Sequence, residues 1–245
     1  MPLARCKNVL IAVVLVSTFA VCIQANWQSE KDPDRPLCKS SRCQKIRAFL
    51  MAHYCGKSPF GNGPEDSCDT RGEKKPGPGT KVIANYVCKE NETDGTETCL
   101  QRGKPSPRDR SILIREMRRI GLPAQRDKEV HFTVLENKSS GWSLMAADYD
   151  HVSGTDLADL TICEVIVVSN ESGRPHVLHK VPFQKTSANE SNLSTWSPVD
   201  IADVDGDGHM EFVLEGDALE DHWLEVVGVQ DGYFKTIFSG LGYYL

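Results

Sequence analysis

Residues 203–211, with the sequence Asp-Val-Asp-Gly-Asp-Gly-His-Met-Glu, constrain the fold of this chain more than any other stretch. Carboxylates occupy the first, third, fifth and ninth positions, and Gly208 stands at the sixth. Side chains two residues apart on a tightly turning backbone converge on one point, and glycine permits the reversal of the chain. Four carboxylates held close together repel one another unless a cation lies among them. The stretch therefore predicts a turn that binds a cation.

The predicted ligands are all oxygen atoms: the carboxylates of Asp203, Asp205, Asp207 and Glu211, and the backbone carbonyl of His209 at the seventh position. An all-oxygen cage selects a hard divalent ion, and the size and flexibility of this one favour calcium (Ca²⁺) over magnesium. The alternative is a polar hairpin turn without a metal. A turn needs no such density of acids, so we favour the calcium site.

The segments on either side of the loop read as strands, at residues 199–202 and 212–214. A loop between two helices would need a carboxylate at position twelve, where Leu214 stands. The strand–loop–strand arrangement resembles the FG-GAP/VCBS repeats, which form the blades of integrin-α-like β-propellers. The resemblance implies that the same five residues hold calcium, and that the protein recognises a protein or carbohydrate ligand. Two features depart from it: Glu211 replaces the more usual Asp, and no Phe-Gly/Gly-Ala-Pro signature precedes the loop.

Residues 1–25 resemble a secretory signal peptide. Arg5 and Lys7 make a basic start, and residues 9–23 form an apolar run that is short for a membrane span, which needs about 20 residues. The alternative is an uncleaved N-terminal anchor. We expect a secreted or periplasmic protein with no membrane attachment after the signal is cleaved.

Six of the nine cysteines lie between residues 38 and 99. In an exported chain such a cluster predicts a disulfide framework, for which six cysteines allow 15 pairings. A zinc site is the competing interpretation, but no Cys-x-x-Cys pair occurs. Cys163 stands alone in the apolar run 160–168, so we expect it to be a buried, inert thiol.

Charge changes sign near residue 126. Residues 31–126 carry an excess of Lys and Arg, whereas residues 127–245 are acidic, and the whole chain has a formal net charge of −6. These shifts predict a cysteine-rich helical and loop region at 26–126 and a β-rich domain at 127–245. The basic region could attract nucleic acid or dock on the acidic domain, and we favour docking, with no nucleic-acid partner.

Two helices are predicted in the basic region. Apolar residues recur at helical spacing from Ser41 to Tyr54, and Gly56 ends the pattern. Ser106 and Pro107 provide an N-cap and a first-turn proline for a second helix that runs to Ile120. We expect the arginines of this second helix to form a solvated face.

The acidic domain contains a weak internal repeat. Residues 142–150 parallel 196–205, and residues 164–173 parallel 225–232. The second unit predicts four strands, at 196–202, 211–216, 222–229 and 233–239, with a turn at Asp231-Gly232. In the first unit only Asp148 and Asp150 remain of the cage, so a second calcium ion is doubtful. The predicted fold class is α+β: a disulfide-tied helical region followed by an antiparallel β-rich domain of two propeller-blade-like units.

Two units cannot close a propeller, which typically needs four to eight blades. They could pack face to face as a sandwich, join edge to edge as one sheet, or lean on the cysteine-tied helices. We favour the third arrangement, in which the N-terminal region covers a propeller-like sheet.

The sequence favours a non-catalytic binding protein over an enzyme, because no hydrolase or phosphate-binding motif appears. The alternative is a secreted calcium-dependent hydrolase whose site is assembled from scattered residues such as His151 and His222. A third hypothesis is that the cysteine-rich half works alone as an inhibitor or ligand. Five Asn-x-Ser/Thr sequons would be glycan acceptors on surface loops in a eukaryotic secretory route, at Asn91, Asn137, Asn170, Asn189 and Asn192.

Overall fold

The computed structural model describes residues 40–55, 75–90, 97–152, 160–171, 173–186, 194–218 and 221–244. These residues form mostly antiparallel β-sheet with few helices. None of the helices in the described ranges combines the length and the apolar character that crossing a membrane requires. The predicted signal peptide lies outside the described residues, as do Cys38 and Cys68, so export and the disulfide framework stay predictions.

The larger sheet has six strands in the order β2-β1-β3-β4-β5-β6, and all neighbours are antiparallel. Its strands are β1 (Thr80–Glu90), β2 (Glu97–Gly103), β3 (His131–Asn137), β4 (Trp142–Val152), β5 (Leu160–Asn170) and β6 (His176–Thr186). Strands β1 and β2 were not predicted from the sequence. Because β1 pairs with β3, the sheet draws strands from both sides of residue 126.

The register of β1 and β2 places the backbone of Cys88 opposite that of Cys99, and the disulfide framework stays a prediction.

The smaller sheet is a four-stranded meander in the order β10-β9-β8-β7. Its strands are β7 (Thr195–Ala202), β8 (Glu211–Asp217), β9 (Asp221–Gln230) and β10 (Tyr233–Tyr244). The four strands predicted for the second unit are confirmed, although β10 extends further than expected. The predicted turn between the last two strands is confirmed as well, since Asp231 and Gly232 both have positive φ, at 54° and 80°.

Both predicted helices are confirmed, as α2 (Ser41–His53) and α3 (Pro107–Arg119), and a short 3₁₀ helix follows at Ala124–Arg126. The Ser40 hydroxyl caps α2 by accepting a hydrogen bond from the Cys43 amide at 3.1 Å. Ser106 caps α3 in the same way, through the Asp109 amide at 3.1 Å. In each case a short polar side chain satisfies a backbone donor that the first helical turn leaves open.

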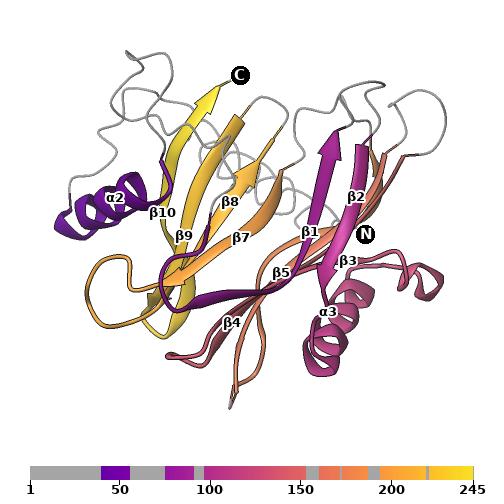
Figure 1. Ribbon diagram of the computed structural model, residues 1–245, viewed down its shortest axis with the longest axis horizontal. Helices are drawn as coiled ribbons and strands as arrows, with labels where there is room; N and C mark the ends of the chain where they lie inside the picture. Colours follow the sequence, from indigo (N-terminus) through magenta and orange to yellow (C-terminus); the bar gives the residue numbers. More distant parts are fainter. Residues whose placement is uncertain are drawn as a thin grey trace, which may run out of the picture. The chain divides into compact units, whose positions relative to one another are not determined.

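Helix α3 packs on one face of the six-stranded sheet (Figure 1). Its fully buried residues Leu113 and Met117 join a core cluster with side chains from β3, β4 and β5. Cys163 belongs to the same cluster, with its Sγ 3.8 Å from the sulfur of Met117. Burial raises the pKa of the Cys163 thiol to about 12, and the negative charge of Glu164 adds to the effect. The prediction of a buried free thiol is confirmed.

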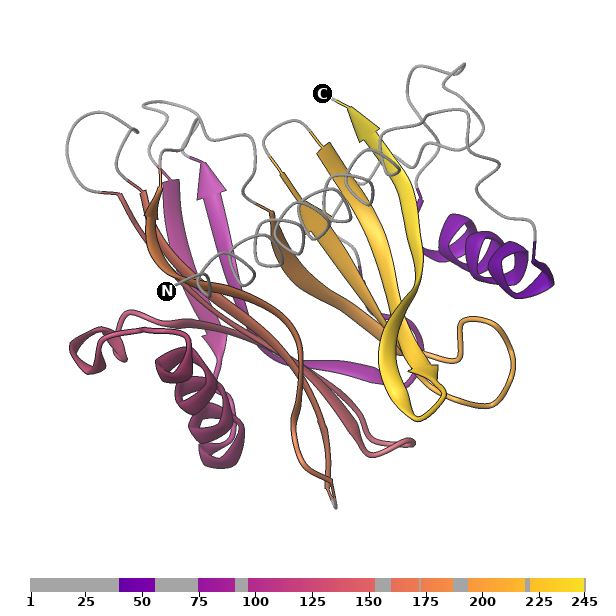
Figure 2. The same ribbon diagram turned by 180° about the vertical axis from the view of Figure 1, so that it is seen from behind.

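The other face of the six-stranded sheet packs against the four-stranded sheet. A second core cluster joins the two sheets and consists of Leu135, Leu144, Ala146, Ile166, Val168, Ile201, Phe212, Leu214 and Val227. Strand β5 is consequently buried along almost its whole length, as expected of a strand covered on both faces. Figure 2 shows the two sheets from behind as separate sets of strands. The two sheets thus pack face to face, the first of the three arrangements considered above, and not the third, which the sequence favoured.

The internal repeat does not correspond strand for strand. Its first copy lies on β4 and β5, which pair directly with each other. Its second copy lies on β7 and β9, which are separated by β8. Asp148 and Asp150 do not lie in a loop but within β4. There they stand opposite Glu164 and Ile162 of β5, respectively. The acidic turn between β7 and β8 therefore has no counterpart at these positions.

Asn137, one of the five sequon asparagines, does not lie on a surface loop as expected. The side chain of Asn137 is buried, with 4 % of its surface exposed, and its Nδ2 donates to the carbonyl of Ile201 at 3.0 Å. Its Oδ1 accepts from the hydroxyl of Ser139 and the amide of Ser140. Asn137 therefore ends β3 and ties it to β7, because its two polar atoms bond to groups on both sides.

Candidate cation site in the β7–β8 loop

The loop of residues 203–210 joins β7 to β8 and turns at two glycines. Gly206 has φ +74° and Gly208 has φ +87°, values that side-chain-bearing residues rarely adopt. Val204 is buried and anchors the start of the loop. The reversal predicted at Gly208 is confirmed, and Gly206 contributes a second one.

Amides within the loop hold its carboxylates in place. Asp203 accepts from the amides of Asp207 and Gly208, one with each oxygen, at 3.0 Å. Asp205 accepts from the Asp207 amide through Oδ1 at 3.0 Å, and Glu211 accepts from the Val204 amide through Oε2 at 2.8 Å. One oxygen of Asp205 and one of Glu211 are therefore left over from these amide contacts.

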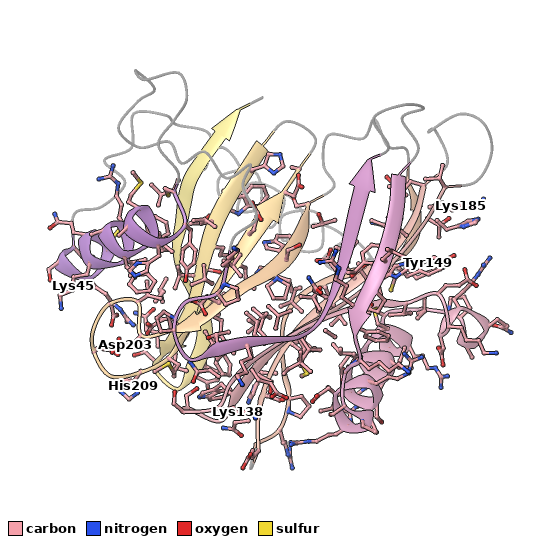
Figure 3. All side chains as sticks on the ribbon, in the orientation of Figure 1. Lys45, Lys138, Tyr149, Lys185, Asp203 and His209 are labelled. Carbon is pink, nitrogen blue, oxygen red and sulfur yellow. The ribbon has the colours of Figure 1, made fainter. Side chains whose placement is uncertain are left out.

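Three of the five predicted ligands lie together. One carboxylate oxygen from each of Asp203, Asp205 and Glu211 falls within 4.8 Å of the others. Asp207 is exposed and lies outside this set, with its Oδ1 accepting from the amide of His209 at 2.8 Å. His209 is exposed on the same loop (Figure 3), and the role predicted for its carbonyl stays a prediction. The acids converge from the start and the end of the loop, because β7 and β8 are antiparallel neighbours.

An arginine from α2 reaches into this group of acids. Arg42 Nε donates to Asp205 Oδ2, and its Nη2 lies 3.5 Å from Glu211 Oε1 and 3.7 Å from Asp207 Oδ2. The guanidinium thus contacts the oxygens of Asp205 and Glu211 that the loop amides leave over. Arg42 supplies one positive charge beside the four carboxylates of the loop, so the local charge remains negative.

The electrostatics of Glu211 reflect this excess. Burial raises the pKa of Glu211 to about 7, and the negative charges of Asp205 and Asp207 act in the same direction. The Val204 amide and Arg42 oppose the rise without cancelling it. A second positive charge at this place would favour the ionised carboxylate, which is the effect that a bound cation would have.

A buried carboxylate near the end of β7, that of Asp200, fixes the strand that leads into the loop. Asp200 has no exposed surface and accepts through Oδ2 from the hydroxyl of Tyr54 and from the Gly77 amide at 2.9 Å. Its Oδ1 accepts from the Ile201 amide at 2.7 Å. Asp200 therefore connects the end of α2, the segment before β1, and the strand that leads into the loop.

A second polar group lies between the two sheets around Trp196. The Trp196 amide donates to Glu164 Oε1 at 2.9 Å, and the indole Nε1 donates to Glu225 Oε2 at 3.2 Å. Glu225 Oε1 lies 2.9 Å from His179 Nε2 and accepts from the hydroxyl of Thr236 at 2.7 Å. Burial acts to raise the pKa of Glu225, but the contacts with His179, Thr236 and Trp196 outweigh it and lower that pKa.

The pKa of Glu164 is shifted upward, in the direction opposite to that of Glu225. Burial raises its pKa to about 8, the Trp196 amide lowers it, and the charge of Asp148 raises it further. Asp148 lies directly opposite on β4, and its own pKa is raised to about 7 by burial and by Asp150. The two facing carboxylates therefore hold protons near neutral pH that exposed acids would have lost.

The two histidines of the hydrolase hypothesis lie on different sheets. His151 is exposed near the end of β4, in the six-stranded sheet, and His222 is half-buried on β9, in the four-stranded sheet. His222 Nδ1 lies 3.5 Å from Asp217 Oδ1 on the neighbouring strand. The structure thus pairs His222 with an acid on β8, whereas the sequence analysis considered acids beside it in the chain.

Sequence reasoning missed Arg42 and Asp200. Each contacts a partner more than 140 residues away in the chain, so no local spacing could have pointed to it. Asp200 does stand within the predicted strand 199–202, where an acid on the buried face could have indicated a structural or functional role.

Compared with known family models, curated proteins and solved structures, the chain matches none of them.

Proposed function

We propose that this protein is an exported, non-catalytic binding module in which a calcium ion braces the β7–β8 loop. The observation that carries the proposal is the convergence of Asp203, Asp205 and Glu211, whose oxygens lie within 4.8 Å of one another. Asp205 and Glu211 are buried there, with 4 % and 1 % of their surfaces exposed. Burying two carboxylates side by side costs free energy, which a divalent cation would recover.

The nature of the donors supports calcium in particular. Carboxylate and carbonyl oxygens suit hard cations, and calcium accepts six to eight of them in a flexible geometry. The exposed Asp207 and the carbonyl of His209 stand on the same loop, and we expect them to turn toward the ion and complete the cage. Magnesium demands a stricter octahedron and retains several water molecules, so we expect it to bind more weakly.

A binding role for the module follows from the resemblance to FG-GAP/VCBS repeats and from the four-stranded meander. A four-stranded antiparallel sheet with the calcium loop between its first two strands is the arrangement expected of one propeller blade. We infer a protein or carbohydrate ligand, recognised by the surface that the braced loop presents. The hydrolase hypothesis stays a prediction from the sequence, and it requires His151 and His222, from different sheets, to act at one site.

Calcium is expected to stabilise the protein, and Asp205→Asn to remove most of that effect. Extracellular calcium sites bind with dissociation constants of about 10⁻⁴ to 10⁻³ M. Calcium at 5 mM should therefore raise the free energy of unfolding by about 1–2 kcal/mol and Tm by a few degrees. Differential scanning calorimetry with calcium, with magnesium and with a chelator measures this shift.

Asp231→Asn is the matched control, because Asp231 is an exposed acid in a plain hairpin turn of the same sheet. Its calcium-dependent rise in Tm should equal that of the unmodified protein. Isothermal titration with calcium measures binding itself. No heat of binding and no change of Tm at 5 mM calcium would show that the loop is a metal-free polar turn.

A further inference from the structure

We propose that Arg42 is a built-in competitor of the cation, so that calcium binding displaces its guanidinium and releases the N-terminal turn of α2. This inference rests on the proposed calcium site and concerns its regulation. It starts from the position of Arg42, which comes from a helix at the far end of the sequence yet contacts three acids of the loop.

The oxygens available to a metal and to Arg42 are the same atoms. The loop amides already use Asp205 Oδ1 and Glu211 Oε2. The remaining oxygens, Asp205 Oδ2 and Glu211 Oε1, are the ones that face the guanidinium. Calcium binds carboxylate oxygens at 2.3–2.6 Å. Two cations cannot share these buried oxygens at such distances without strong repulsion, so occupation by calcium excludes Arg42.

The two occupants differ in what they connect. Arg42 is 38 % exposed, whereas Asp205 and Glu211 are buried, so the guanidinium can leave for water while the acids stay. Its departure would cost the N-terminal turn of α2 its contact with the loop. The helix from Ile46 onward remains fixed, because Ile46 and Leu50 are fully buried and Tyr54 donates to Asp200. Calcium would therefore loosen one end of α2 without detaching the helix.

Calcium titrations of the unmodified protein, Arg42→Gln and Lys45→Gln test the competition. Lys45 is exposed on the same helix and labelled in Figure 3, so its replacement removes an equal charge without touching the loop. We expect Arg42→Gln to bind calcium about tenfold more tightly, since a charge-assisted hydrogen bond no longer has to be broken. Lys45→Gln should bind within about twofold of the unmodified protein, because an exposed distant charge is screened.

Hydrogen exchange of the unmodified protein, with and without calcium, tests the displacement directly. Amides of residues 43–45 should exchange faster with calcium, while amides of the loop at 203–210 should exchange more slowly. Unchanged or slower exchange at residues 43–45 would overturn the displacement even if the affinity of Arg42→Gln rises. Calcium binding with equal affinity for Arg42→Gln would overturn the competition alone. No calcium binding by any of the three proteins would overturn the proposed site, and the competition with it.

Discussion

Asp200→Ala should lower the free energy of unfolding by about 3–4 kcal/mol. The substitution leaves the hydroxyl of Tyr54 and the amide of Gly77 without their acceptor in the interior, and each such buried donor costs about 1–3 kcal/mol. It also removes the acceptor for the Ile201 amide at the end of β7. Equilibrium urea unfolding of the two proteins measures the difference.

Tyr54→Phe is the matched control, because it removes one donor and keeps the carboxylate with its two amide partners. We expect it to cost about 1–2 kcal/mol, and the double variant to cost less than the sum of the single variants. Such coupling would locate the effect in the hydrogen bond between Tyr54 and Asp200. Additive costs, or a cost of Asp200→Ala below about 1 kcal/mol, would contradict this account of Asp200 as the support of the loop.

Glu164→Gln should remove much of the loss of stability that occurs as the pH rises from about 4.5 to about 8. The pKa of Glu164 is raised to about 8 in the folded protein, above the value of about 4.5 expected in the unfolded chain. The folded state therefore holds a proton that the unfolded state has released. Stability is greatest below pH 4.5 for this group and is lost as the pH rises through 8. Asp148, with its pKa raised to about 7, acts in the same direction.

We expect the unmodified protein to lose on the order of 3 kcal/mol between pH 5 and pH 9, and Glu164→Gln about half of that. Glutamine keeps the oxygen that accepts from the Trp196 amide, so the contact survives while the charge is lost. Glu136→Gln on β3 is the control and should follow the unmodified protein. Urea unfolding at pH 5, 7 and 9 provides the comparison. Asp150 and His131, which lie near Asp148, are present in all three proteins. Equal losses for all three proteins would refute the assignment to Glu164.

Local patterns were sufficient for several elements. The serine caps predicted α2 and α3, the apolar run around Cys163 predicted a buried thiol, and the turn at Asp231-Gly232 fixed the hairpin of β9 and β10. These features depend on residues within a few positions of one another. A pattern of that kind failed for β1 and β2, although residues 82–87 are apolar apart from Asn85, because a short apolar run beside many cysteines and glycines indicates a loop equally well.

The sequence by itself determined that acids gather in the β7–β8 turn, since glycines and alternating carboxylates impose this on any hairpin there. Only the tertiary structure decided which distant side chains contact the loop and the strand before it. Arg42 reaches them across 163 residues and Tyr54 reaches Asp200 across 146. The packing of two sheets likewise brings Glu164 and Glu225 to opposite ends of Trp196. Such contacts arise because burial of the apolar faces brings distant segments together, and no spacing along the chain records which polar groups then meet.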